Sequence, residues 1–254
     1  MKVFLAQPLV LAVLIGIAGC ATTTTPPEEE SWDAGKRADV HAQLAASYMQ
    51  RDQLEIARSE LEQALQIKAD HSRANYIMAV LQTRLGNNAE AETYFRRAVS
   101  ADKENSQAAH DYGVYLCKQG RVDQAMAQFD EALANPLYRG DALTALRAGE
   151  CLIFNGNSPD VAETYFRRAL NINPKLAPAL YQMSEINFAR GNFLSARAYI
   201  ERYFSAAQET PRTLLLAYRI ENELGAADVA EDYAARLRKK FATSEEAKRL
   251  RSGR

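Results

Sequence analysis

The chain holds few side chains that could perform chemistry: three histidines and three cysteines in 254 residues. His41, His71 and His110 stand far apart and form neither an H-x-x-H nor an H-E-x-x-H motif. Those spacings are the ones that place two zinc ligands on one face of a helix. The histidines therefore predict no metal site.

The motifs of common enzyme sites are also missing from the sequence. It contains no G-x-S-x-G elbow, no G-x-x-x-x-G-K-[ST] phosphate loop and no G-x-G-x-x-G turn. Its 31 basic and 32 acidic residues give a net charge of −1, so no overall field would attract nucleic acid. We expect no catalytic site, no cofactor, no small-molecule substrate and no nucleic-acid partner.

The first cysteine ends a short apolar segment. Lys2 precedes an apolar run over residues 9–17, which is too short to cross about 30 Å of hydrocarbon but suits a signal peptide. The run leads into Ala-Gly-Cys at Cys20, which resembles the lipobox of bacterial lipoproteins. That resemblance implies a signal peptide over 1–19, acylation of Cys20 by palmitate or a similar chain, and, because Ala21 follows it, the outer membrane. An ordinary secretory signal with a chance cysteine is the alternative.

Residues 20–37 follow as a segment rich in Thr, Pro and Glu. Such a composition offers little apolar surface to bury, so it predicts an extended, solvated tether.

From residue 38 the chain repeats itself with a period of 34 or slightly more. Six alanines recur in one register, each preceded by a turn residue and followed four positions later by an apolar residue, aromatic in three of the six. The alanines are Ala57, Ala91, Ala125, Ala162, Ala196 and Ala230, and the turn residues are Asp52, Gly86, Gly120, Gly156, Gly191 and Gly225. This pattern resembles the tetratricopeptide repeat, a pair of helices that buries its apolar stripe only by stacking on neighbouring pairs.

The resemblance implies an all-α fold, a right-handed superhelical solenoid of six helix-turn-helix repeats. We place these repeats at residues 38–71, 72–105, 106–139, 142–176, 177–210 and 211–244. Gly140 and Asp141 are extra residues before the fourth repeat, where we expect a local change of pitch. Residues 245–254 remain as a basic tail, either a solvated helix end or a contact for a partner or anionic lipid.

Cys117 and Cys151 fall in the first helices of the third and fourth repeats. Because first helices of adjacent tetratricopeptide repeats lie side by side, the two sulfurs could reach each other. An exported protein meets an oxidising compartment, which favours a disulfide. Two buried reduced thiols are the alternative.

In the tetratricopeptide family, fixed positions of each first helix line a concave wall that binds peptides or amphipathic helices. Their equivalents here mix aromatic and charged residues, any of which could instead be core. The predicted partner-binding residues are Met49, Arg73, Tyr76, Arg84, His110, Lys118, Glu150, Tyr181, Glu185 and Phe188, with Ala42, Val80, Val114, Leu146 and Phe154 on the same wall.

The lipobox, tether and six repeats together resemble the PilF/PilW pilotin family of type IV pilus biogenesis lipoproteins, most specifically over residues 107–120. That resemblance implies a non-catalytic outer-membrane lipoprotein that faces the periplasm. It would bind the pilus secretin subunit and promote its localisation and multimerisation. A lipoprotein serving another envelope assembly, such as outer-membrane protein insertion or cell-wall synthesis, is the alternative.

Overall fold

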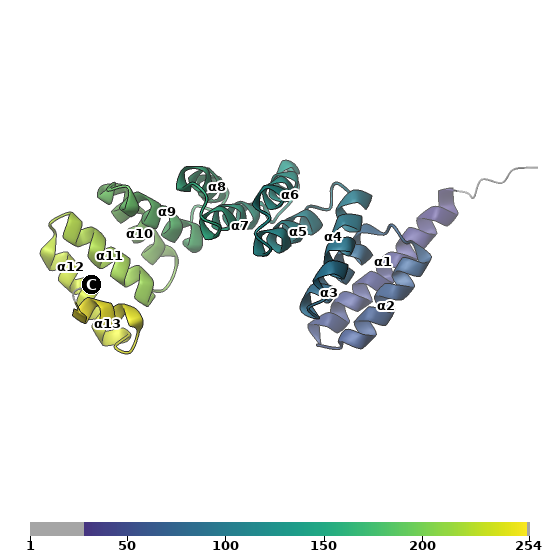
Figure 1. Cartoon of the computed structure of the whole chain (residues 1–254), viewed down its shortest axis with the longest axis horizontal. Coiled ribbons are helices and arrows are strands. Elements are labelled where there is room, and N and C mark those ends of the chain that lie inside the picture. Colours follow the sequence, from purple (N-terminus) through teal and green to yellow (C-terminus); the bar gives the residue numbers. More distant parts are fainter. Residues whose placement is uncertain (1–27, 253–254) are drawn as a thin grey trace, which may run out of the picture.

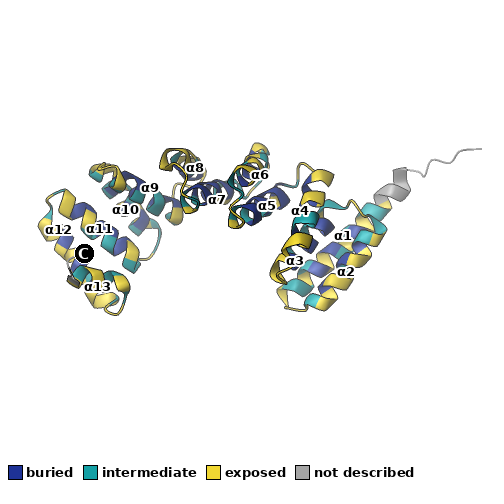
Figure 2. Cartoon of the chain, viewed as in Figure 1, coloured by how far each residue is buried: buried dark blue, intermediate teal, exposed yellow. Residues whose placement is uncertain are grey.

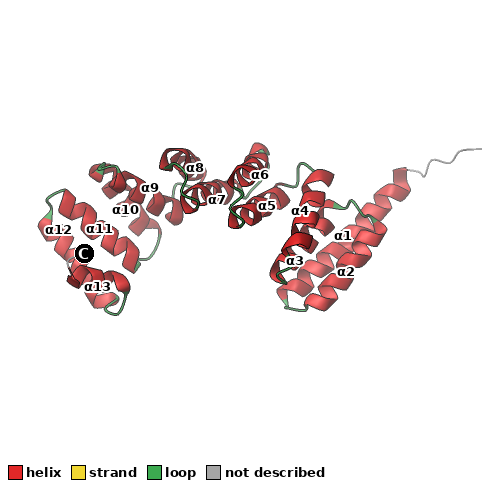
Figure 3. Ribbon diagram, in the orientation of Figure 1, coloured by secondary structure: helices red, strands yellow, loops and turns green. Residues whose placement is uncertain are grey.

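A computed structural model describes residues 28–252, and within that range the chain forms thirteen α-helices and no strand (Figures 1 and 3). Twelve helices form six consecutive helix-turn-helix pairs, and the thirteenth packs on the last pair. The pairs are α1 (Glu28–Gln50) with α2 (Leu54–Ile67), α3 (Ser72–Arg84) with α4 (Asn88–Ala101), α5 (Ser106–Lys118) with α6 (Val122–Ala134), α7 (Asp141–Phe154) with α8 (Pro159–Ile172), α9 (Ala177–Ala189) with α10 (Phe193–Ala206) and α11 (Pro211–Glu223) with α12 (Ala227–Lys240). The predicted all-α tetratricopeptide solenoid is confirmed.

The tether is shorter than predicted. Helix α1 begins at Glu28, so residues 28–37 are helical and the expectation of an extended chain there was wrong. Arg37 pairs with Asp33 one turn earlier, at 3.6 Å, and Ala38 is fully buried. A paired charge and a buried alanine let the first turns continue into the packed part of the helix. The signal peptide, Cys20 and residues 20–27 lie outside the described residues.

The basic tail is largely a helix with a buried contact. Helix α13 (Glu245–Ser252) packs on α11 and α12. Ala247 is fully buried in a cluster with Leu214 and Leu237, and Leu250 lies against the same cluster. The helix therefore covers apolar residues of the sixth repeat where the next unit of such an array would stack.

The turn inside each pair uses the residues that the repeat predicted. Gly86, Gly120, Gly156, Gly191 and Gly225 have φ between 71° and 81°, and Asp52 has φ of 61°. This left-handed conformation costs glycine little because glycine has no Cβ. Each turn reverses the chain within three or four residues.

Two glycines inside helices allow the helices of their own pairs to approach closely. A Cβ on Gly113 would stand 2.7 Å from the ring of Phe129, and a Cβ on Gly149 would stand 2.6 Å from the ring of Phe166. Both phenylalanines are fully buried. The repeat thus sets a ring of the second helix directly against the backbone of the first.

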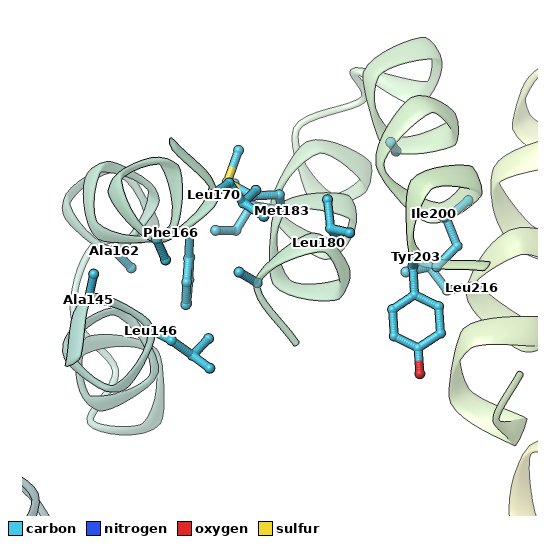
Figure 4. Close-up of a cluster of buried hydrophobic side chains, with 14 of the residues drawn as sticks. Ala145, Leu146, Ala162, Phe166, Leu170, Leu180, Met183, Ile200, Tyr203 and Leu216 are labelled. Atoms are coloured by element: carbon cyan, nitrogen blue, oxygen red, sulfur yellow. The ribbon is translucent and has the colours of Figure 1, made fainter. Parts of the chain in front are cut away.

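Consecutive repeats are joined by apolar residues in a common register. Met78, Tyr112, Leu146, Leu180 and Leu214 stand 34 residues apart on successive first helices and are at most 6% exposed. Each lies in one cluster with residues of the preceding second helix, as Leu146 does with Leu133. Figure 4 shows the largest of these clusters, in which Phe166, Leu180, Ile200 and Leu216 connect α8 to α11. The core is therefore a continuous stripe along the array.

The stacked pairs form an arc (Figure 1). In the middle of the arc α5 and α7 lie on its inner side, and α6 and α8 lie on its outer side. Buried residues gather between the helices and exposed residues cover both sides (Figure 2). None of the helices within residues 28–252 has the length and apolar character that crossing a bilayer requires.

Candidate protein-binding site

The first helices of repeats one and two enclose a groove, which we call groove 1. It is lined by α1 and α3 with an edge from α5, and its volume is about 630 Å³. Four predicted residues meet there, namely Met49, Arg73, Tyr76 and Arg84. Its other lining residues are Gln43, Ala46, Gln50, Ile77, Val80, Asn105 and Gln107. The structure therefore brings together the predicted residues of the first two repeats.

The charges of groove 1 are paired across the repeat junction. Arg73 donates to both carboxylate oxygens of Asp39, at 3.0 and 3.2 Å. Arg84 donates to Asp52 at 2.7 Å and to the carbonyl oxygen of Met49 at 3.0 Å. Both arginines thus have acidic partners, and most of the surface exposed in groove 1 belongs to apolar atoms. Such a surface suits an apolar anchor of a bound peptide.

A polar network closes groove 1 toward the third repeat. The Tyr76 hydroxyl donates to Asp111 Oδ2 at 2.6 Å, and the side-chain amide of Gln107 donates to the same oxygen at 2.9 Å. Tyr138 donates to Gln107 at 3.3 Å. Burial, reinforced by the Asp111 carboxylate, raises the pKa of Tyr76 well above its usual range, so the hydroxyl stays protonated and keeps this bond. We call Tyr76, Gln107, Asp111 and Tyr138 the polar ridge.

The inner side continues beyond the polar ridge as groove 2, between the ends of α5 and α7. It has a volume of about 540 Å³ and contains the predicted residues Lys118 and Glu150. Its other lining residues are Val114, Cys117, Phe129, Arg147, Cys151 and Phe154. Glu150 accepts from Arg147 at 2.6 Å, and Lys118, the other cation of this groove, forms no salt bridge within the described residues.

A disulfide forms one wall of groove 2. Cys117 and Cys151 are bonded, with their Cα atoms 5.8 Å apart. Cys151 is buried, and the side-chain amide of Asn155 lies 3.5 Å from the sulfur of Cys117. The predicted pairing of these two cysteines is the one in the structure, and it joins α5 to α7.

Groove 3 lies at the other end of the array, between α9, α11 and α13. The predicted residues Tyr181 and Glu185 line it, and the Tyr181 hydroxyl donates to Glu185 at 2.7 Å. Arg212, Arg219, Glu246 and Arg249 add charge of both signs. Phe188 is not part of this lining, because the Arg219 guanidinium covers its ring at 4.5 Å.

His110 is not on the accessible wall, so its prediction as a partner-binding residue was wrong. It is 6% exposed, its Nδ1 lies 2.7 Å from the Thr144 hydroxyl, and its ring meets the edge of Phe129. Burial lowers the pKa of His110 despite the carboxylate of Asp111. Leu146 and Ala42 are likewise core residues, at 2% and 0% exposed.

Eight of the ten predicted partner-binding residues thus divide among three grooves, His110 and Phe188 lie in none of them, and the ten do not form one continuous wall. The prediction missed Arg147, Arg212 and Arg219 as lining residues. The repeat itself contains the signal for two of them, because a step of 34 residues leads from Glu185 forward to Arg219 and from Tyr181 back to Arg147. No group of three or more His, Cys, Asp or Glu side chains within residues 28–252 is arranged to hold a metal ion.

Comparison with known proteins agrees with this architecture. The sequence profile of the tetratricopeptide repeat matches residues 43–109 and 79–142. The type IV pilus assembly protein PilF of Pseudomonas aeruginosa is 26% identical over 235 residues, which cover 92% of each chain.

Two solved structures have the same fold over most of their length. The crystal structure of PilW, a type IV pilus biogenesis factor, superposes with a TM-score of 0.68 and 30% identity over 84% of this chain and 97% of PilW. The structure of Pseudomonas aeruginosa PilF superposes with a TM-score of 0.76 and 23% identity over 87% of this chain and all of that one. The chain therefore belongs to the tetratricopeptide-repeat family of type IV pilus biogenesis factors that includes PilF and PilW.

Proposed function

We propose that this protein is a non-catalytic pilotin, a lipid-anchored adaptor of the outer membrane that binds the type IV pilus secretin subunit from the periplasmic side. It would promote the localisation and multimerisation of the secretin and so support pilus formation and twitching motility. The secretin as partner, the acylation of Cys20 and the membrane location all follow from the resemblance to pilotins.

Groove 1 is the observation that carries this proposal. It is an open surface with an apolar lining and arginines at its margin, in a chain that belongs to a pilus biogenesis family. Apolar residues that line an open groove leave free energy to be gained when a partner covers them. Val80 lies in groove 1 between Tyr76 and Arg84, one turn from each along α3, and is only partly buried.

The anchor and the groove act together in this mechanism. Acyl chains on Cys20 hold the adaptor at the membrane, since each buried methylene contributes about 0.8 kcal/mol. Groove 1 then binds secretin subunits that arrive in the periplasm. Confinement to one membrane surface raises the local concentration of bound subunits, which favours their association without any covalent chemistry.

A deletion strain tests the proposal. We expect it to lose secretin multimers from its outer-membrane fraction and to lose twitching, and the wild-type gene to restore both. Val80→Glu, which places a charge in groove 1, should not restore them. Val229→Glu makes the same change on α12, where Val229 is 46% exposed and lines none of the three grooves, and should restore them fully.

Normal secretin multimers in the deletion strain would contradict the proposal. If the deletion strain instead loses outer-membrane barrel proteins or cell-wall integrity, that result would favour the alternative function in outer-membrane protein insertion or cell-wall synthesis. Immunoblotting for each variant and thermal unfolding of the purified proteins establish that Val80→Glu folds and accumulates. If Val80→Glu fails that control, Met49→Lys changes the same groove from α1.

A further inference from the structure

Groove 2 has the features of a docking surface of its own. Binding of a partner to groove 1 alone would leave these features without a role. Phe154 lines it and is 83% exposed, the most exposed of the large apolar side chains described for this chain. Its ring has no aromatic neighbour among the ring pairs of the described residues. Phe154 is the last residue of α7, and the disulfide to α5 lies three residues earlier. The disulfide fixes the backbone that carries the ring, so a partner that covers Phe154 need not order this end of α7 when it binds.

The charge of groove 2 selects for a particular partner residue. Arg147 and Glu150 neutralise each other at 2.6 Å, and Lys118 contributes a positive charge at the edge of the groove. The local excess is one positive charge beside an exposed aromatic ring. A bound segment would therefore place an apolar side chain on Phe154 and an acidic side chain near Lys118.

Grooves 1 and 2 lie on the same side of the arc, separated by the polar ridge. Helices α3, α5 and α7 follow one another along the inner side of the arc (Figure 1). Packed helices lie about 8 to 10 Å apart, and α3 and α5 are in looser contact than α1 and α3 or α5 and α7, so the centres of the two grooves are at least about 18 Å apart. An extended chain needs at least about six residues, at about 3.3 Å per residue, to cover that distance.

We infer that grooves 1 and 2 bind one continuous segment of the partner, with one apolar anchor in each groove, the two anchors at least about six residues apart, and an acidic residue beside the second anchor. The inference rests on the proposed function, because it takes the secretin subunit as the partner. The side chain of Asp111, 31% exposed on the polar ridge, disfavours acidic residues in the middle of the segment. Two linked anchors make the second contact intramolecular, so each groove strengthens the other.

Site-specific cross-linking tests this arrangement. A photoreactive benzoylphenylalanine replaces Gln50, an exposed residue of groove 1, or Phe154 in groove 2, in the full-length acylated protein purified in detergent. After irradiation with purified secretin, mass spectrometry locates the cross-linked residues. We expect both positions to cross-link to one secretin segment, at residues about six to ten apart. Leu194, 70% exposed on α10 and part of none of the three grooves, is the control position and should give no cross-link.

Affinity measurements complete the test. Phe154→Ala and Lys118→Glu should each raise the Kd for secretin at least tenfold, whereas Leu194→Ala and Lys239→Glu should leave it unchanged. The inference would be overturned if positions 50 and 154 cross-linked to distant parts of secretin, or if both groove 2 variants left the Kd unchanged. In either case, binding of secretin by the wild-type protein would still support the proposed function. Failure of the wild-type protein to bind secretin would overturn both.

Discussion

At the scale of single residues, two helical glycines stand where a larger side chain would meet a buried phenylalanine. Gly113 and Gly149 each lie under the ring of a fully buried phenylalanine, at distances that leave no room for a methyl group. Helix propensity alone would favour alanine at both positions by about 1 kcal/mol. The packing of the ring must therefore outweigh that preference.

Gly113→Ala should lower the free energy of unfolding by about 1 to 3 kcal/mol, because the added methyl group displaces the Phe129 ring. Urea denaturation of the purified protein measures this change. Gly35→Ala is the control, since Gly35 is also helical but has no atom within 4 Å of an added Cβ. That control should be neutral or slightly stabilising, and an equal loss in both variants would contradict the packing argument.

His110 should make stability depend on pH. Its folded-state pKa is lowered chiefly by burial, with Asp111 raising it and Arg147 lowering it further. The unfolded chain therefore takes up the proton first, so the stabilising effect is present above about pH 6.5 and declines as the pH falls toward the folded-state pKa. The slope of unfolding free energy between pH 7.5 and 5.5 should be smaller in His110→Asn than in the wild type, and equal slopes would refute this. His71, whose pKa is also lowered by burial, contributes equally to both proteins.

The sequence predicted the residues whose environment repeats and missed those whose environment does not. The six alanines of the second helices are all 0% or 1% exposed, because the 34-residue period alone sets their surroundings. His110 occupies a wall position by the same period, but Thr144 of the following repeat covers it. The Thr144 hydroxyl donates to the carbonyl of Gly140, one of the two extra residues before that repeat. Because Thr144 stands 34 residues after His110, the period predicts that the two are neighbours but not that one side chain covers the other.

At the scale of helices, α5 and α7 are joined near both ends. His110 contacts Thr144 near their first turns, and Cys117 is bonded to Cys151 near their last turns. Both pairs span 34 residues. These connections hold the one junction where the repeat period is interrupted.

Loss of the disulfide should therefore be costly. Closing a loop of this length contributes about 3 to 4 kcal/mol in the chain-entropy model. The double variant Cys117→Ala, Cys151→Ala should lose about that much free energy of unfolding, and reduction of the wild-type protein should have the same effect. A double variant as stable as the oxidised wild type would show that packing alone holds this junction.

The terminal helix α13 should stabilise only its own end of the array. Ala247→Asp places a charge in a fully buried position and should release α13 from Leu214 and Leu237. Because repeats interact only with their neighbours, hydrogen exchange should speed up in α11 to α13 and stay unchanged in α1 to α6. Thr243→Asp, an exposed neighbour, is the control. Faster exchange along the whole chain would contradict local coupling.

Helices with strong periodicity were predictable, and the ends of the array were not. Helix α13 has only Ala247 and Leu250 as apolar residues on a highly charged stretch, so its contact with Leu214, far away in sequence, has no local signal. Helix α1 starts ten residues before the predicted repeat because the composition of residues 28–37 suggested a solvated chain. At both ends, tertiary packing decides what local composition cannot.

At the scale of the whole molecule, stacking six pairs produces an arc whose inner side carries separate grooves with different chemistry. Groove 1 is mostly apolar with its arginines paired, groove 2 combines a disulfide, an exposed aromatic ring and Lys118, and groove 3 is mainly charged. Membership of a pilus biogenesis family and this division of the inner side together direct the proposed adaptor role toward the first two grooves.

The most direct test is the affinity of the full-length acylated protein, in detergent, for the purified secretin subunit of the same organism, measured by isothermal titration calorimetry. We predict saturable binding that Val80→Glu weakens at least tenfold and that Val229→Glu leaves intact. Absence of binding by the wild-type protein, or equal affinity in both variants, would contradict the account.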